Sequence, residues 1–190
     1  MSLQACFYEA QHILHTTGAY LRQFLVDDKG CVLIACWGMP HMSYLDNAHR
    51  ALSAATQIRH EFERLEMETS VGITCADVYC GTVGSSERME YAAIGSAVNM
   101  AARIMGKAKG RLLVDQVVYN HLPKSAYEAM EAIDPMTVKG RATALQAYQF
   151  VESKSSKTSG APDGSEISLQ CRTVLHTLLQ TMVGVVLYFI

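Results

Sequence analysis

Residues 88–103 read Arg-Met-Glu-Tyr-Ala-Ala-Ile-Gly-Ser-Ala-Val-Asn-Met-Ala-Ala-Arg, and this run decides how the rest of the chain is interpreted. Its first half has the character of a strand at 91–94. Gly95 follows, and the second half favours a helix that carries Asn99 and Arg103. Because these two residues are four apart, they project from one face of the helix in the same direction. Asparagine can orient an oxygen through hydrogen bonds, and arginine can hold a charged phosphoryl group in a fork of donors.

The composition is that of an ordinary globular protein. The chain has 190 residues, of which 49% are hydrophobic and 18% charged, which suits one domain of roughly 150 residues with a tail. The formal net charge of −2 offers no polycation for nucleic acid. Six cysteines form no CxxC pair and no zinc-like spacing, which favours reduced, buried thiols in a cytoplasmic protein. No basic stretch followed by an apolar segment opens the chain, so no secretory signal is expected.

The hydrophobic pattern predicts mixed helices and strands as far as residue 151. Apolar residues recur at helical spacing over 3–17, and the turn Asp27-Asp28-Lys29-Gly30 joins two strands into a hairpin. Asp46 is expected to cap a long helix. The predicted elements are helix 3–17, strands 20–26 and 31–37, helix 46–67, a strand opening at 71, strand 91–94, the helix with Asn99, strand 111–114, helix 115–122, and strands 136–140 and 145–151. This order suits an α+β fold with helices packed on one antiparallel, ferredoxin-like sheet.

The C-terminal part differs in composition. Residues 153–168 are rich in Ser, Lys, Gly, Pro and Asp and are predicted to form a flexible linker. Residues 169–190 are apolar, but polar residues interrupt them, and the uninterrupted part, 181–190, is shorter than the roughly 20 residues that span a bilayer. We expect a buried or docking helix, or the start of a further element, more than a membrane segment.

The run at 88–103 resembles the signature of the class III nucleotidyl cyclases, the adenylyl and guanylyl cyclases. A second stretch resembles the family pattern Gly-Ile-His-x-Gly-x-x-x-x-Gly-x-x-Gly: Gly72, Ile73, Gly81 and Gly84 match, whereas Thr74 replaces the usual His and Ala76 a usual Gly. Glycines at 81 and 84 would allow a sharp hairpin or bulge. The resemblance covers about residues 3–152 and identifies 1–152 as a nucleotidyl cyclase domain. Domains of this family normally begin with one further strand, so this domain is expected to be N-terminally incomplete or to take that strand from elsewhere.

The resemblance implies a reaction and three site residues. Class III cyclases close a nucleoside triphosphate into a cyclic monophosphate and release pyrophosphate, in sites between two domains. One half brings two metal-binding aspartates, and the other brings an Asn, an Arg, a Lys and the base-reading residues. By this resemblance, Asn99 would orient the ribose and Arg103 would stabilise the charge on the transition-state phosphate. Lys139, in Val138-Lys139-Gly140, would reach the triphosphate.

The metal-binding side is expected to be absent from this chain. Metal-holding halves of the family carry Gly-Asp at the hairpin turn, whereas here Gly30 is followed by Cys31. Asp27 and Asp28 precede the glycine and are expected to form the turn rather than bind Mg²⁺. A hard cation needs oxygen ligands of this kind. Catalysis is therefore expected to require a metal-bearing partner half, which would hold Mg²⁺ or Mn²⁺ in a pseudo-heterodimer.

Neither purine code of the family is present in the sequence. Adenylyl cyclases usually place a Lys on the first hairpin strand and an Asp or Thr seven residues before the Asn, and guanylyl cyclases a Glu and a Cys. The second position here is Ala92, and the first falls near Arg22 or Gln23. The backbone of Ala93 could still meet the base edge. Other details most resemble the second cyclase domain of soluble, bicarbonate-responsive adenylyl cyclases, which favours ATP as substrate.

Two other functions compete with catalysis. A non-catalytic, cyclase-like module would pair with another cyclase domain and regulate it. Ala92 and the missing Lys favour this alternative, whereas the intact Asn99, Arg103 and Lys139 oppose it. An RNA-binding domain on a similar sheet would need paired exposed aromatics and a basic face, and the strands show neither.

Overall fold

The computed structural model describes residues 3–27, 30–40, 42–139, 142–152 and 178–189. Its elements are α1 (Leu3–Thr16), β1 (Tyr20–Asp27), β2 (Gly30–Trp37), α2 (Asn47–Glu63), β3 (Thr69–Gly84), β4 (Met89–Ile94), α3 (Ala97–Ala108), β5 (Leu112–Asp115), α4 (Gln116–His121), the 3₁₀-helix η1 (Lys124–Ala129), β6 (Met130–Ala132), β7 (Ala147–Phe150) and β8 (Leu178–Phe189). The linker predicted at 153–168 lies outside the described residues.

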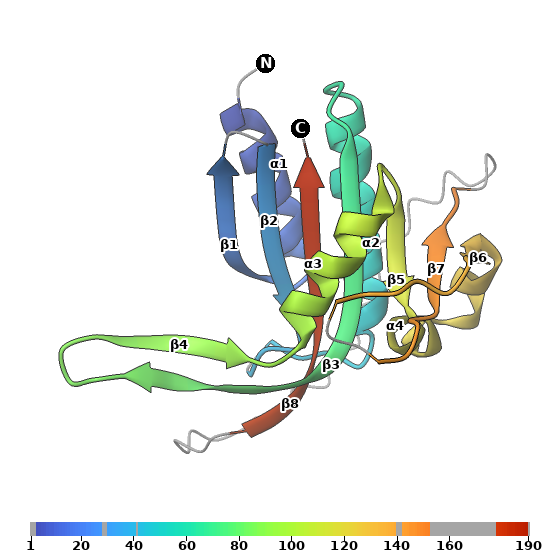
Figure 1. Cartoon of the computed structure of the whole chain (residues 1–190). Coiled ribbons are helices and arrows are strands. Elements are labelled where there is room, and N and C mark those ends of the chain that lie inside the picture. The colour runs from blue at the N-terminus through green and yellow to red at the C-terminus, as the bar shows by residue number, and fades with distance from the viewer. Residues whose placement is uncertain (1–2, 28–29, 41, 140–141, 153–177, 190) are drawn as a thin grey trace.

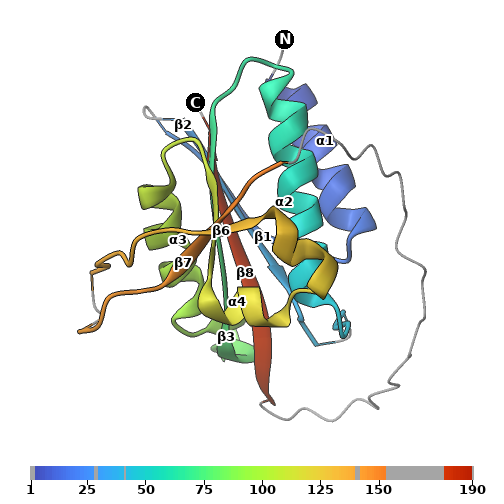
Figure 2. The same cartoon turned by 90° about the vertical axis from the view of Figure 1, so that its right-hand side faces the viewer.

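One sheet organises the fold. Its strands lie in the order β1-β2-β8-β3-β5-β7-β6, and β4 pairs with β3 beside this path. Helices α1 and α2 cover one face and α3 the other, as the two views in Figures 1 and 2 show. The predicted α+β sheet with packed helices is confirmed. Its strand pairs are antiparallel except for β3 and β5, which run parallel.

The main core lies between the sheet and the α1–α2 layer. Helix α2 buries a stripe that follows its helical period: Ala48, Ala51, Leu52, Ala54, Ala55, Ile58 and Phe62. The facing side chains of β2 alternate along the strand, as the period of two requires, and include Leu33 and Trp37. Trp37 Nε1 donates to the Thr17 carbonyl oxygen at 3.1 Å, which ties the end of α1 to the sheet.

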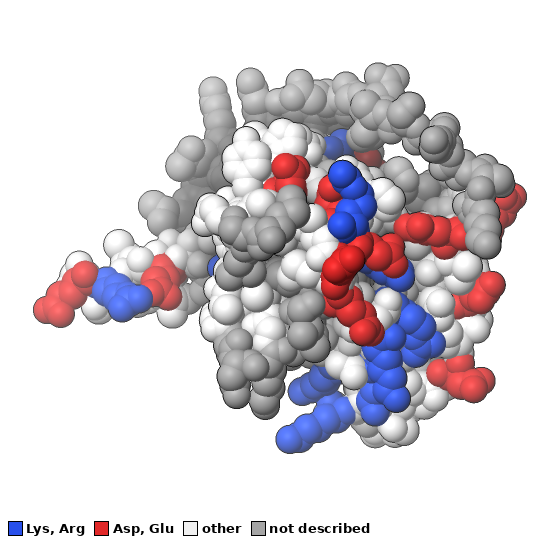
Figure 3. All heavy atoms as spheres, turned by 90° about the horizontal axis from the view of Figure 1, so that it is seen from above, with Lys and Arg blue, Asp and Glu red and all other residues white. Residues whose placement is uncertain are grey.

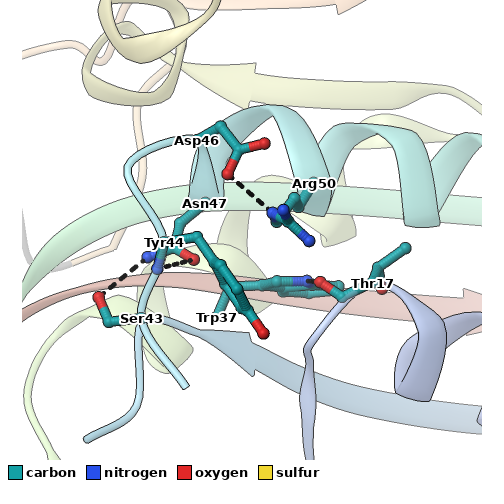
Figure 4. A network of polar contacts seen from close by, with 7 residues as sticks. All are labelled: Thr17, Trp37, Ser43, Tyr44, Asp46, Asn47 and Arg50. Carbon is teal, nitrogen blue, oxygen red and sulfur yellow. Dashed lines mark hydrogen bonds and ion pairs between the residues drawn. The ribbon is translucent and has the colours of Figure 1, made fainter. Parts of the chain in front are cut away.

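The segment before α2 departs from the expected cap. Asp46 occupies the N-cap position, but its carboxylate makes no capping hydrogen bond and accepts from Arg50 Nε at 2.7 Å. The Arg50 guanidinium lies 4.0 Å from the centre of the Tyr44 ring. Both side chains are drawn in Figure 4. Asn47 accepts from the Tyr44 backbone nitrogen at 3.2 Å and donates to Ser43 Oγ at 3.4 Å. These contacts hold the segment before α2 in place, but none of them caps an amide of the first helical turn.

A long hairpin, formed by the second half of β3 with β4, projects from the sheet as an arm (Figure 1). It turns after Gly84, which has a φ of +143° that favours glycine. The Ser85 amide donates to the Arg88 carbonyl oxygen at 2.9 Å and closes the turn. Gly81 stays in the regular ladder opposite Ala92. The predicted hairpin therefore turns at Gly84, without the alternative bulge.

Two predictions about the C-terminal half are wrong. The strand expected at 136–140 is reduced to one bridge between Met136 and Leu145, and the short strand β6 was not predicted. The helix considered for 169–190 is replaced by strand β8 over its described part. A continuous apolar run does not distinguish a buried strand from a buried helix, which explains the second error.

Candidate active site

Helix α3 presents a polar face because its other face is packed on the sheet. Its buried residues recur at helical spacing and are Ala97, Ala101, Ile104 and Ala108. On the outward side Asn99 is exposed and Arg103 is half-buried. The four-residue spacing therefore places both side chains as the sequence predicted.

Two glycines allow α3 to pack closely against the sheet. A Cβ atom on Gly72 of β3 would clash with the Ala101 carbonyl oxygen and the Met105 backbone nitrogen. A Cβ atom on Gly95, in the turn before α3, would come within 2.6 Å of Val78 Cγ1. Both close approaches require glycine, which fixes the distance of the polar face from the sheet.

The donors on this face are uncommitted. Neither Asn99 nor Arg103 makes a side-chain hydrogen bond or ion pair with another residue in the part of the chain that the structure describes. A half-buried guanidinium with free donors is suited to a phosphate group, which accepts hydrogen bonds from two donors of the fork.

Lys139 lies on a segment that packs against α3. Its neighbour Val138 is buried in a small core with Ile104 and Ala108 of the helix, whereas Lys139 itself is exposed. The Lys139 ammonium group therefore emerges beside the same helix as Asn99 and Arg103, although the three come from separate parts of the sequence.

The sequence did not single out Lys107, which continues the polar face. It is exposed, four residues after Arg103, and lines a cavity of about 550 Å³ together with Lys109 and Arg111. Arg111 is largely committed to structure, since it donates to the carbonyl oxygens of Lys107 and Ala108 at the end of α3. The spacing 99, 103, 107 would have identified this residue.

A second cavity, of about 440 Å³, lies next to the start of α3, within the size range of roughly 300–1,000 Å³ typical of small-molecule sites. It is lined by Tyr20, Arg22, Gln23, Cys36, Met39, Glu90, Tyr91, Ala92 and Ala93. Cys36 and Met39 also pack against Ala97 of α3, which places the cavity two residues from Asn99 along the helix. The cavity thus unites both positions at which the family resemblance places base-reading residues.

Arg22 reaches this cavity through an irregularity in β1. The register between β1 and β2 shifts between Leu21 and Gln23, so Arg22 is the extra residue of a β-bulge. Its Nη1 donates to the Ala93 carbonyl oxygen of β4 at 3.2 Å. A donor and an acceptor therefore lie side by side in the cavity wall, at the place where Ala92 contributes no polar side chain.

Cys36 contributes a buried thiol to the cavity wall. Burial raises the pKa of its thiol from the ordinary value of 9.0 to about 12, although the nearby Arg22 charge acts in the opposite direction. The thiolate is scarce at neutral pH, so Cys36 acts as part of the cavity wall.

Thr74, which replaces the usual family His, has a structural partner. Its hydroxyl donates to Asp115 Oδ2, and Asp115 Oδ1 accepts from the Val118 amide at 2.8 Å and caps α4. Burial raises the pKa of the Asp115 carboxyl above its ordinary value of 3.8, while these hydrogen bonds lower it in part. The pair joins the end of β5 to β3.

The described residues offer no cluster of side chains that fits a divalent metal. Within the described ranges, no group of three or more His, Cys, Asp or Glu side chains is arranged to hold an ion. Asp27 ends β1 and pairs with Gly30 across the hairpin turn, and Asp28 lies outside the described residues. We therefore derive no step of the chemistry through a metal bound by this chain.

Comparison with known proteins gives the family. The family model of the adenylate and guanylate cyclase catalytic domain matches residues 33–152, which include α3, Lys139 and most of the cavity wall. The chain belongs to this family. Human adenylate cyclase type 10 is 29% identical to this chain over 151 residues. The matched region is 78% of this chain and 9% of that protein.

Solved structures show the same fold. The adenylyl cyclase CyaB from P. aeruginosa aligns with a TM-score of 0.67 and 24% identity, over 80% of this chain and 81% of that chain. The guanylate cyclase domain of RhGC from Catenaria anguillulae, crystallised in complex with GTP, aligns with a TM-score of 0.66 and 21% identity, over 78% and 81%. No helix in the described part of the cyclase domain is long and apolar enough to cross a membrane.

Proposed function

We propose that this domain is the transition-state-stabilising half of a class III adenylate cyclase that converts ATP to cyclic AMP and pyrophosphate. The observation that carries the proposal is the free polar face of α3, with Asn99 and Arg103, beside a cavity of nucleobase size. The product would act in intracellular signal transduction, and we place the enzyme in the cytoplasm.

The proposed reaction is an in-line displacement at the α-phosphate. The ribose 3′ oxygen attacks phosphorus and loses its proton, while the bond from the α-phosphorus to the bridging oxygen breaks and pyrophosphate leaves. Asn99 would orient the ribose, and Arg103 would donate to the phosphoryl oxygens as charge develops on them. Lys139 would hold the triphosphate as a point charge, and Lys107 lies on the same face to extend this positive surface.

The cavity wall can pair with a purine base. The Watson–Crick edge of adenine has an acceptor, N1, next to a donor, the N6 amino group, and guanine presents O6 and N1–H in the same way. Arg22 and the Ala93 carbonyl present a donor beside an acceptor, which complements either edge without any side chain from Ala92. The similarity to adenylate cyclase type 10 is the observation that favours ATP over GTP.

The metal would come from a partner half. Such a half would hold Mg²⁺ or Mn²⁺ through its aspartates, and the two domains would form a pseudo-heterodimer. The projecting hairpin offers a surface for this pairing, since it exposes large apolar side chains: Tyr79, Val83, Met89, Tyr91 and Ile94. In Figure 3 the hairpin stands out from the molecule, with charged side chains of both signs along it.

The alternative is a catalytically inactive module that pairs with a cyclase domain and regulates it. The apolar Ala92 in the cavity wall is the observation that favours it. Binding of a non-cyclisable ATP analogue to the assembled pair separates the two functions, because only the catalytic half needs to hold the triphosphate.

The decisive experiment measures cyclic AMP and cyclic GMP formed from ATP and GTP with Mn²⁺. The chain is assayed alone and mixed with a metal-bearing cyclase half, as wild type and as Arg103→Ala. Arg64→Ala is the matched control, because Arg64 is an exposed arginine at the end of α2, on the other face of the sheet. Activity in the mixture that only Arg103→Ala abolishes supports the proposal. Activity of the chain alone, or a silent but assembled mixture, refutes it.

A further inference from the structure

The last strand of the chain lies in the middle of the sheet. Strand β8 (Leu178–Phe189) is inserted between β2 and β3 and runs antiparallel to both, as Figure 1 shows. It pairs with Cys31–Trp37 along β2 and with Thr69–Cys80 along β3. Residues 33–152, which match the family model, do not include it.

Strand β8 is the link between the two halves of the sheet. Strands β2 and β3 do not pair with each other. The backbone groups along the facing edge of each strand bond to β8 instead. The adjoining residues are deep in the core: Leu33, Ala35, Val71 and Ile73 are all buried. Without an inserted strand, two rows of backbone N–H and C=O groups would face each other unpaired at this depth, which is strongly unfavourable.

Strand β8 also supports the polar helix. Helix α3 packs against both β3 and β8, and its Ala97 lies in one small core with Cys36 of β2 and Val78 of β3, the strands on either side of β8. The position of Asn99 and Arg103 is therefore coupled to whether the centre of the sheet is filled.

We propose that Leu178–Phe189 is a complementing strand, supplied by the C-terminal side of the same chain. It takes the central place between β2 and β3, in a domain that the family resemblance expects to lack its usual first strand. Filling this place closes the sheet and orders α3, so the C-terminal segment controls whether the nucleotide face forms. Its effect on activity rests on the proposed function, whereas the insertion itself and the ordering of α3 do not.

A single cysteine tests the register and the origin of the strand. Val183 pairs with the native Cys75 of β3, so Val183→Cys places two thiols side by side, while Val185→Cys, opposite Ala35 and Ile73, has no thiol partner. The full chain is refolded under oxidising conditions and the linked peptides are identified by mass spectrometry. We expect an intramolecular 75–183 disulfide in Val183→Cys and no disulfide to residue 185 in Val185→Cys. An intermolecular link, which would mean donation by a second copy, or no link overturns the proposal.

A proline tests the coupling to α3. In a strand paired on both sides each interior amide donates to one neighbour or the other, so Val185→Pro removes a ladder bond. Hydrogen exchange in the full chain should accelerate on the order of tenfold or more in β2, β3 and α3, and much less in Ser159→Pro, which changes the segment whose composition predicts a linker. Unchanged protection of α3 and both strands in Val185→Pro would overturn the proposal. These readouts need no nucleotide, so they stand apart from the activity assay.

Discussion

Arg22 is the residue that we expect to read the purine. Its guanidinium reaches the cavity only because a bulge inserts one residue into β1, and it donates to the Ala93 carbonyl oxygen at 3.2 Å. Arg22→Ala should raise the KM for ATP roughly 10- to 100-fold in the assembled pair, as expected for loss of one charged hydrogen bond, with a smaller change in kcat. Arg22→Lys keeps the charge but lacks the forked donors of the guanidinium, so its KM for ATP should lie between the values of the wild type and Arg22→Ala. Steady-state kinetics with ATP and GTP measure both variants, and an unchanged KM for Arg22→Ala would exclude this role.

Asp115 should make stability depend on pH. Burial raises the pKa of its carboxyl above 3.8, so the folded state binds the proton more tightly than the unfolded state. Its contribution to the free energy of unfolding is therefore greatest at low pH. It decreases as the pH rises from the unfolded pKa through the raised folded pKa, and is constant above that.

Asp115→Asn isolates this effect. Asparagine is also a good N-cap and can still accept from the Val118 amide, but it does not ionise. Urea unfolding of both proteins between pH 3.5 and 7 should show a larger fall in the free energy of unfolding for the wild type. Parallel pH profiles would show that the Asp115 carboxyl has the same pKa in the folded and unfolded states.

The sequence predicted part of this site, and the reason is local spacing. Asn99 and Arg103 follow from one helical turn, and Lys139 follows from a short family segment that the structure places beside α3. The first base-reading position could be placed only near Arg22 or Gln23, and the bulge that brings Arg22 to the cavity was not predicted. The partnership of Thr74 with Asp115 joins residues 41 positions apart and needed the fold.

At the scale of elements, the contact between α3 and β3 depends on a single missing side chain. Gly72→Ala would place a methyl group against the backbone of α3 at Ala101 and Met105. Backbone atoms, unlike a side chain, cannot relieve the clash by changing rotamer. Overpacking of this kind typically costs about 1–3 kcal/mol, and it should also displace Arg103 and reduce activity.

Gly106, in the same helix, is the matched control. A Cβ atom there meets nothing within 4 Å, so Gly106→Ala should stabilise the domain by about 0.5–1 kcal/mol through helix propensity alone. Thermal or urea unfolding compares the two variants. Equal effects of the two substitutions would mean that the helix does not approach the sheet as closely as the structure shows.

Elements with a clear local signal were predictable, and those without one were not. The stripe of α2 recurs at the helical period, and β2 is a short apolar run that follows the turn at 27–30, so both elements followed from the sequence. Strand β6 has only three residues, Met-Glu-Ala, too few to show an alternation. Strand β8 was missed because its neighbours come from the N-terminal half, and pairing between distant segments leaves no local signal.

At the scale of the whole molecule, the projecting hairpin is the surface that we expect to hold the partner half. Met89 is 67% exposed on β4 and lines no part of the cavity, so Met89→Glu should leave the isolated domain folded while placing a charge in the interface. Burying an unpaired carboxylate is costly, and we expect the affinity for the metal-bearing half to fall at least tenfold.

Tyr8→Glu provides the control for this prediction. Tyr8 is 65% exposed on α1, which covers the face of the sheet opposite α3 (Figure 2), so it is matched in exposure and distant from the hairpin. Sedimentation velocity of each variant mixed with the metal-bearing half measures the fraction assembled, and circular dichroism checks that each is folded. If Met89→Glu assembles as well as Tyr8→Glu does, the two halves pair through another surface, and the apolar hairpin has a different partner.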